Sequence, residues 1–281
     1  MTMMRALGCL SAVIAMAFSG ECRAAEGKEA SIIFSSNRGG GWAIWTVKPD
    51  GSAITQLTKP EKEEQDVDPA FNADGSRILF TSTRGGKAGI WVMGRDGADA
   101  KRVCDGDQGG WSPDSKKIVL RRGGKLVVRE LEGGKEKVIS PDGMEKCSGA
   151  SWSPDGSSIA FALLGEGSNA LYILPAEGGE AKKIYDKQGA CQPHWAPSGK
   201  FLVYETETHL CTINADGTKN RLITYFGGVQ RFARFNPEGT KLVFCQAASP
   251  EGPWELYVIP ATGGTPVKLT EGGSDMYPDW K

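Results

Sequence analysis

Short apolar runs and polar stretches alternate along most of the chain. Segments such as Ile78-Leu79-Phe80 and Ile90-Trp91-Val92 are rich in β-branched and aromatic residues, and Gly, Asp, Ser and Pro separate them. Short runs bounded by turn residues predict β-strands, and no stretch carries a convincing helical period. We therefore expect an all-β protein.

One motif recurs through the chain: an aromatic residue followed by a turn of the type Ser-Pro-Asp-Gly. The aromatic residues are Phe71, Trp111, Trp152, Trp195, Phe235 and Trp280, at intervals of 40, 41, 43, 40 and 45 residues. Such a period is typical of propeller blades with four strands each. Within each period, two apolar strands precede an Asp-Gly or Gly-Gly hairpin turn, and a more polar strand, suited to an outer edge, ends the unit. The repeat predicts a six-bladed β-propeller.

The strand types are out of phase with the chain ends. Ser31 to Ser36 matches the second strand of a blade, and Met276 to Trp280 matches a first strand. We expect the C-terminal segment to form the innermost strand of the blade that the N-terminal segment begins. Pairing of the two ends would close the ring and replace end caps.

The N-terminal residues have the features of a secretory signal peptide. Arg5 precedes the apolar stretch Ala6 to Phe18, and Ala24 offers a cleavage site. The apolar stretch is too short to span a bilayer, so we expect no membrane insertion. Glu21 precedes Cys22 where lipoprotein processing requires a small residue, which argues against lipidation. We predict a signal peptide over 1–24, a linker over 25–30, a propeller over 31–281, and a periplasmic or secreted location.

Composition narrows the functional classes. A formal charge of -1 does not favour nucleic acid as a partner. The chain has only 2 histidines, no Gly-x-Ser-x-Gly motif and no phosphate-binding glycine motif, so we expect no cofactor and no enzymatic activity. A catalytic carboxylate pair across blades stays open, because the sequence does not reveal such pairs.

Cleavage near Ala24 would leave five cysteines, an odd number in an exported protein. We expect Cys211 and Cys245 to be buried free thiols within apolar strands. Cys147 and Cys191 precede equivalent inner strands of successive repeats, so a disulfide between them is a further alternative.

The repeat resembles the TolB-type, WD40-like propeller repeat. The clearest copies run from Asp68 to Gly97 and from Trp152 to Gly179. The resemblance implies a periplasmic propeller that binds proteins or other ligands. Blade residues follow the predicted signal peptide almost directly, so we expect no counterpart of the N-terminal α/β domain of TolB, and membership of a Tol–Pal system stays open.

If the first strand of each blade lines the channel, one face of the ring collects the loops between second and third strands and the loops between blades. Loops on a rigid scaffold are where binding residues concentrate. The candidate binding face comprises Arg38, Asp66, Asp68, Arg84, Arg121, Lys146, Gln192, His194, Glu205, Gln230, Arg231, Asp275 and Tyr277.

Structural roles compete with ligand binding at several positions. Arg38 and Arg84 occupy matching places in successive blades, which favours a structural role such as binding a carboxylate. A packing role is expected for His194, and a salt bridge between blades for Arg234 and Asp279.

Three functional hypotheses follow. The first is a monomeric binding or scaffolding module that engages a protein partner in the cell envelope with its loop-rich face. The second is a propeller, possibly an enzyme, that acts on a carbohydrate or small ligand at the channel mouth. The third is a structural module stabilised by a cation in the channel.

Overall fold

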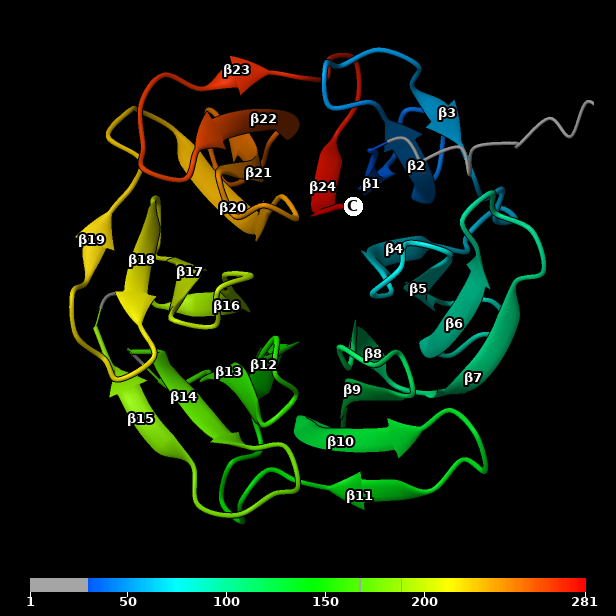
Figure 1. Ribbon diagram of the computed structural model, residues 1–281. Helices are drawn as coiled ribbons and strands as arrows, with labels where there is room; N and C mark the ends of the chain where they lie inside the picture. Colours follow the sequence, from blue (N-terminus) through cyan, green and yellow to red (C-terminus); the bar gives the residue numbers. More distant parts are fainter. Residues whose placement is uncertain (1–29, 167, 188) are drawn as a thin grey trace, which may run out of the picture.

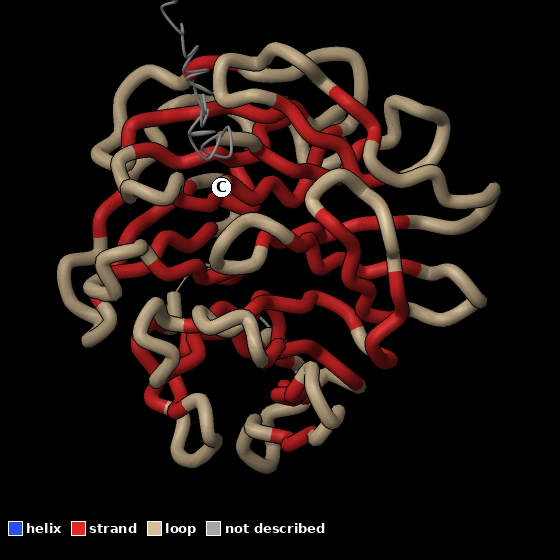
Figure 2. The backbone as a smooth tube through the Cα atoms, turned by 45° about the vertical axis from the view of Figure 1, so that its right-hand side comes forward, coloured by secondary structure: helices blue, strands red, loops and turns tan. Residues whose placement is uncertain are grey.

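The computed structural model describes residues 30–166, 168–187 and 189–281, and the predicted signal peptide lies outside this part of the chain. The described residues form six four-stranded antiparallel sheets arranged in a ring around a central axis (Figure 1). The described part contains strands and loops but no helix (Figure 2). The predicted six-bladed propeller is confirmed.

The blades are numbered along the chain, and their strands are given from the axis outwards. Blade 1 consists of β24 (Asp275–Trp280), β1 (Ile32–Ser36), β2 (Ala43–Val47) and β3 (Thr55–Gln56). Blade 2 consists of β4 (Asp66–Phe71), β5 (Arg77–Ser82), β6 (Gly89–Gly94) and β7 (Lys101–Asp105). Blade 3 consists of β8 (Asp107–Trp111), β9 (Lys117–Arg122), β10 (Lys125–Glu130) and β11 (Glu136–Val138).

The remaining blades repeat this order. Blade 4 consists of β12 (Cys147–Trp152), β13 (Ser158–Leu163), β14 (Ala170–Pro175) and β15 (Lys182–Tyr185). Blade 5 consists of β16 (Cys191–Trp195), β17 (Phe201–Glu205), β18 (Leu210–Asn214) and β19 (Arg221–Leu222). Blade 6 consists of β20 (Val229–Phe235), β21 (Lys241–Ala247), β22 (Glu255–Pro260) and β23 (Val267–Lys268).

Blade 1 contains strands from both ends of the chain. The C-terminal strand β24 pairs with β1, so that Trp280 lies opposite Ile32 and Asp275 opposite Ser36 (Figure 1). Beyond the strands, the amide of Ser31 donates to the carbonyl of Lys281 at 2.6 Å, and the amide of Lys281 donates back at 2.9 Å. The predicted closure of the ring by its two chain ends is confirmed.

The hydrophobic core lies between adjacent blades. Five of the six repeat aromatics are buried at the end of their inner strand, and Trp152 is partly buried. The second strands are the most apolar: Phe34, Phe80, Phe161 and Phe244 are almost completely buried. Because the blades form a closed ring, each blade face is covered by a neighbouring blade, and the apolar faces of all six sheets are buried.

The turns behave as their sequence predicts. In the turn after Trp111, the Asp114 carboxylate accepts hydrogen bonds from the Ser112 hydroxyl at 2.6 Å and from the Lys116 amide at 3.0 Å. Asp155 binds its own turn in the same way. These aspartates stabilise local backbone, as Asp residues in turns commonly do.

Candidate functional site

Every inner strand carries a backbone irregularity at the same place. The residue three before each repeat aromatic has a positive φ, between 50° and 61°, and the register with the second strand shifts there. These six residues, which we call the axial ring, are Asp68, Gln108, Gly149, Gln192, Phe232 and Tyr277. A bulge of this kind re-aims a side chain, and a positive φ is uncommon for residues other than glycine.

Neighbouring blades hold the axial ring in place. The amide of Asp68 donates to the Ser35 hydroxyl at 3.0 Å, and the amide of Gln108 donates to the Thr81 hydroxyl at 3.2 Å. Each acceptor belongs to the second strand of the preceding blade, so the unusual backbone is fixed by contacts between blades. Such a conformation persists only where its surroundings determine it.

Asp68 is the carboxylate of the axial ring, and its pKa is perturbed. Burial raises its pKa to about 6, and the nearby Arg234 opposes that rise. The side chain is nevertheless partly exposed to solvent. No hydrogen bond to its carboxylate is made by any residue that the structure describes, so Asp68 differs from the paired acidic residues around it.

An aromatic pair lies across the junction of blades 6 and 1. The ring centroids of Phe232 and Tyr277 are 4.2 Å apart. Burial raises the pKa of the Tyr277 phenol above its usual range, and the charge of Asp68 adds to that effect. The axial ring therefore combines an aromatic side with a polar side that contains Asp68, Gln108 and Gln192.

Arg38 and Arg84 make equivalent ion pairs in blades 1 and 2. Arg38 binds Asp275 at 2.5 Å, and Arg84 binds Asp66 at 2.5 Å; both carboxylates are completely buried. Each guanidinium also lies over two aromatic rings of its own blade, at 5.3 to 5.8 Å. These contacts give the four side chains a structural role.

Two further arginines on this face are paired with carboxylates. Arg121 makes a two-point contact with Asp107, at 2.7 and 3.0 Å. Arg231 lies 3.3 Å from the buried Glu205, which also accepts hydrogen bonds from the amide of Phe232 and the thiol of Cys191. Burial raises the pKa of Glu205.

The other candidates differ in their accessibility. Gln230 is completely buried and contacts the His209 ring at 3.2 Å, whereas Lys146 is exposed. Four of the thirteen predicted residues lie on the loop-rich face or near the axis, are at least partly exposed and make no ion pair among the described residues. They are Asp68, Lys146, Gln192 and Tyr277.

His194 lies at the opposite mouth. It lines a cavity of about 260 Å³ among the turns that follow the repeat aromatics, rather than on the loop-rich face where the sequence led us to expect it. Burial lowers its pKa well below the usual range, and Arg234 adds to this effect, so the imidazole is neutral. His194 directly precedes Trp195, so it lies at the end of β16 that is opposite to the loop-rich face.

The expected salt bridge between Arg234 and Asp279 is wrong for the residues that the structure describes. The Asp279 carboxylate accepts the Phe71 amide of blade 2 at 2.7 Å, and Arg234 donates to the carbonyl of Ala233. The Asp279 carboxylate is therefore bound by the backbone amide of Phe71 instead of the expected Arg234 guanidinium.

All five cysteines after the predicted leader are free thiols, so Cys147 and Cys191 form no disulfide. Cys211 and Cys245 are buried, as expected. Within residues 30–281, apart from positions 167 and 188, no group of three or more His, Cys, Asp or Glu side chains has the arrangement of a metal site. Within the same residues there is no apolar helix of membrane-spanning length.

The family model described as the TolB β-propeller domain matches residues 14–143 and 110–280. These matches cover most of the sequence, so the chain belongs to the TolB β-propeller family. The resemblance of its repeats is thereby confirmed.

Individual relatives are more distant. An uncharacterised protein of Agrobacterium fabrum is 25% identical over 177 residues, which are 60% of this chain and 59% of that protein. A TolB homologue of Chlorobium luteolum is 29% identical over 98 residues, which are 34% of this chain and 22% of the homologue. In both cases the match spans less than two thirds of the relative's own length.

Solved structures share the fold at low identity. TolB from Acinetobacter baumannii matches with a TM-score of 0.75 and 17% identity, over 89% of this chain and 66% of that chain. A putative TolB from Agrobacterium tumefaciens matches with a TM-score of 0.69 and 16% identity, over 90% and 98%. An oligogalacturonate lyase in complex with manganese matches with a TM-score of 0.57 and 17% identity, over 87% and 73%. At these identities the likeness concerns the fold alone.

Proposed function

We propose that this chain is an exported binding module that engages a protein partner in the cell envelope with its loop-rich face, rather than an enzyme. The observation that supports this most strongly is the axial ring, because six bulges at equivalent positions of the inner strands carry residues of unlike chemistry. A rigid scaffold that presents such side chains is suited to recognition.

The chemistry of the accessible residues suits a protein partner. Aromatic residues are enriched at protein interfaces, and the partly exposed Tyr277, which packs against the buried Phe232, supplies apolar area near the polar Asp68. The exposed Lys146 would lie toward the rim, where charges influence the rate of association more than the affinity.

The surroundings of two candidate carboxylates support binding rather than catalysis. The sequence left Asp66, Asp68 and Asp275 open for a carboxylate mechanism; Asp66 and Asp275 are completely buried and held by Arg84 and Arg38, whereas Asp68 is partly exposed. A general acid or base needs access to its substrate within hydrogen-bond reach, and Asp66 and Asp275 lack it.

Export is the part of the proposal that rests on the leader sequence. Residues 1–24 carry the positive and apolar regions of a signal peptide, and membership of the TolB family agrees with action outside the cytoplasm. Amino-terminal sequencing of the protein recovered from a cell-envelope fraction tests this part separately.

Site-specific photocrosslinking in the producing organism tests the binding face. A photoreactive residue at Lys146 or Glu207, both exposed on the loop-rich face, should give a discrete protein adduct that mass spectrometry identifies. The same residue at Lys200, exposed on the opposite face, is the matched control and should give no such adduct. Adducts at Lys200 alone would contradict the proposal and indicate a partner on the opposite face, and the absence of adducts at every position would contradict it and favour a small ligand.

A further inference from the structure

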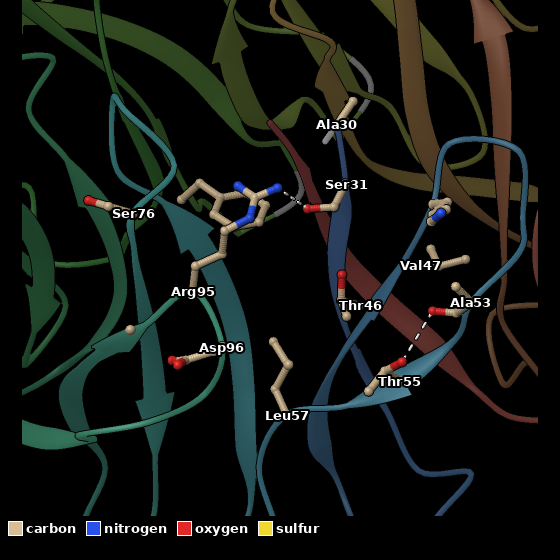
Figure 3. A pocket seen from close by; sticks show the side chains of 13 residues that line it. Ala30, Ser31, Thr46, Val47, Ala53, Thr55, Leu57, Ser76, Arg95 and Asp96 are labelled. Carbon is tan, nitrogen blue, oxygen red and sulfur yellow. Dashed lines mark hydrogen bonds between the residues drawn. The ribbon is translucent and has the colours of Figure 1, made fainter. Parts of the chain in front are cut away.

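A cavity of about 740 Å³ lies between blades 1 and 2, away from the axis, and the protein itself binds a guanidinium there. Figure 3 shows this group, from Arg95, beside Ser31, whose hydroxyl accepts a hydrogen bond from it at 2.6 Å. The Gly75 carbonyl accepts another at 3.0 Å, and the guanidinium lies 4.9 Å from the centroid of the Phe71 ring. Acceptors and an aromatic ring together hold this cation.

A second cavity, of about 460 Å³, lies on the loop-rich face, and we call it the blade 6 cavity. It opens between the loop that joins β19 to β20 and the loop that joins β21 to β22. Its lining includes Gln246, Ala248, Glu255 and Tyr257, and none of the described residues that line it is an arginine or a lysine. The Oε1 atom of Gln246 is buried and has no hydrogen-bond partner among the described residues. A donor that reached this atom would satisfy it.

The strand register aligns the blade 6 cavity with the arginine sites of blades 1 and 2. In blade 2, Arg84 comes six residues after Ile78, which lies opposite the repeat aromatic. In blade 6, Ala248 comes six residues after Leu242, which has the same place. Arg38 is the corresponding residue of blade 1. An alanine that lines a cavity thus stands where two other blades have a paired arginine.

Blade 6 keeps the aromatic pair on which the arginine of blade 2 rests. The ring centroids of Phe80 and Trp91 are 6.4 Å apart, and those of Phe244 and Tyr257, at the same register positions, are 6.0 Å apart. The Arg84 guanidinium lies 5.8 and 5.3 Å from the two ring centroids of blade 2. Tyr257 lines the blade 6 cavity, so one ring of the pair is accessible to a cation there.

The acidic groups around the blade 6 cavity also favour a cation. Lys268 lies 2.8 Å from Glu255 and 3.3 Å from Glu271, so two carboxylates share one ammonium group. These three side chains together carry one net negative charge. The exposed Glu251, in the loop between β21 and β22, adds a further negative charge.

The rim of the blade 6 cavity has the features of a protein interface. Tyr225 lies two residues before Gly227, which lines the cavity, and is 73% exposed. Tyrosine is enriched at protein interfaces. Phe226, from the same loop, packs against Phe244 at 6.3 Å between ring centroids, which fixes the loop beside the cavity.

We propose that the blade 6 cavity binds an arginine side chain of the partner protein, whose guanidinium takes the position against Tyr257 that Arg84 takes against Trp91. This inference rests on the function proposed above and names a side chain that the loop-rich face recognises. The guanidinium stacks on the Tyr257 ring and donates to Glu255 and to the Oε1 atom of Gln246. Arginine suits this site better than lysine, because its planar group stacks on a ring and donates from several nitrogens at once.

N-acetyl-arginine amide, titrated against the ¹⁵N-labelled full chain and followed by NMR, tests the cavity without the partner. We expect saturable shifts of the Gly227 amide and of the Gln246 side-chain amide. N-acetyl-citrulline amide has nearly the same shape without the charge and should bind at least about fivefold more weakly, and N-acetyl-lysine amide should also bind more weakly. Tyr257→Leu should weaken binding of the arginine amide about threefold, because it removes the ring under the cation.

Ala248→Arg provides the sharpest variant, because it supplies a guanidinium from the chain itself. It should stay folded, since blades 1 and 2 carry arginine at this position, and it should weaken binding of the arginine amide at least about tenfold. Thr208→Arg is the matched control. It adds the same charge at the equivalent position of blade 5, where Cys211 replaces the tyrosine ring, and should leave binding unchanged.

The partner captured by photocrosslinking separates this inference from the proposed function. Its affinity for the Ala248→Arg protein should fall at least about tenfold. If the partner binds this variant as tightly as the original protein, the arginine site is wrong although the loop-rich face still binds a protein. Equal binding of the arginine amide and either analogue, unchanged probe binding by a folded Ala248→Arg protein, or no saturable shift at millimolar probe would also overturn the inference.

Discussion

Removal of residues 275–281 should abolish cooperative unfolding of the whole ring. These residues form β24 and the bonds between Lys281 and Ser31, so their loss leaves blade 1 without its inner strand. It also removes the hydrogen bond from the Phe71 amide to Asp279 and the Phe232–Tyr277 contact, which join blade 1 to both neighbours.

The expected cost is comparable with the stability of an ordinary domain. Trp280 is only 8% exposed, and replacing a buried tryptophan by alanine costs about 3–5 kcal/mol. The ion pair of the buried Asp275 with Arg38 is lost in addition, and the faces of blades 2 and 6 are uncovered. A typical domain is stable by only about 5–15 kcal/mol, so the truncated ring should not fold cooperatively.

Circular dichroism during urea and thermal unfolding measures this effect. Phe235→Ala is the matched control, because it removes a buried repeat aromatic from blade 6 without touching the chain ends. It should lower the melting temperature and keep a single transition, as should Trp280→Ala. A truncated protein that unfolds in one transition at the original melting temperature would refute the reasoning.

Three further predictions concern buried charges. Arg84→Met should destabilise the protein by about 3–5 kcal/mol in urea unfolding because it leaves Asp66 buried without its partner, and adding Asp66→Asn should recover most of the loss. Asp68 has a folded pKa of about 6 against 3.8 for the free side chain, so its ionisation lowers stability as pH rises through that interval. Asp68→Asn should therefore melt higher than the original protein above about pH 6 and similarly below about pH 4, and a pH-independent difference would contradict this origin. The lowered pKa of His194 predicts an imidazole that is still neutral in NMR spectra at the ordinary histidine pKa of 6.5, and a midpoint near 6.5 would disprove its burial.

The strand pattern of this chain was predictable because each blade repeats it. The aromatic residue and the turn after it mark one period, and the position of Trp280 one period after Phe235 indicates the closure. Sequence spacing carries this information directly, since each strand type recurs at nearly constant intervals.

The candidate site was predictable only in part. Most positive φ values of the axial ring fall on residue types that do not indicate such a backbone, namely Gln108, Gln192, Phe232 and Tyr277, and only Gly149 and Asp68 hint at it. Phe232 was missed for this reason, although an aromatic residue three positions before Phe235 departs from the polar residues found there in blades 2, 3 and 5.

Pairing between distant residues limits prediction further. Arg38 and Asp275 lie at opposite ends of the chain and meet only through closure of the ring. Their repetition as Arg84 and Asp66 in blade 2 favoured a structural role, but the partner could not be named from sequence.

Binding by the loop-rich face is the central claim, and calorimetry with the protein captured by crosslinking tests it most directly. Tyr277→Ala and Asp68→Asn should each weaken binding of that protein about tenfold or more, because both alter the axial ring. Asp155→Asn, in an exposed turn on the opposite face, should leave the affinity unchanged. Unchanged affinity in both axial-ring variants, or a loss confined to Asp155→Asn, would contradict the account.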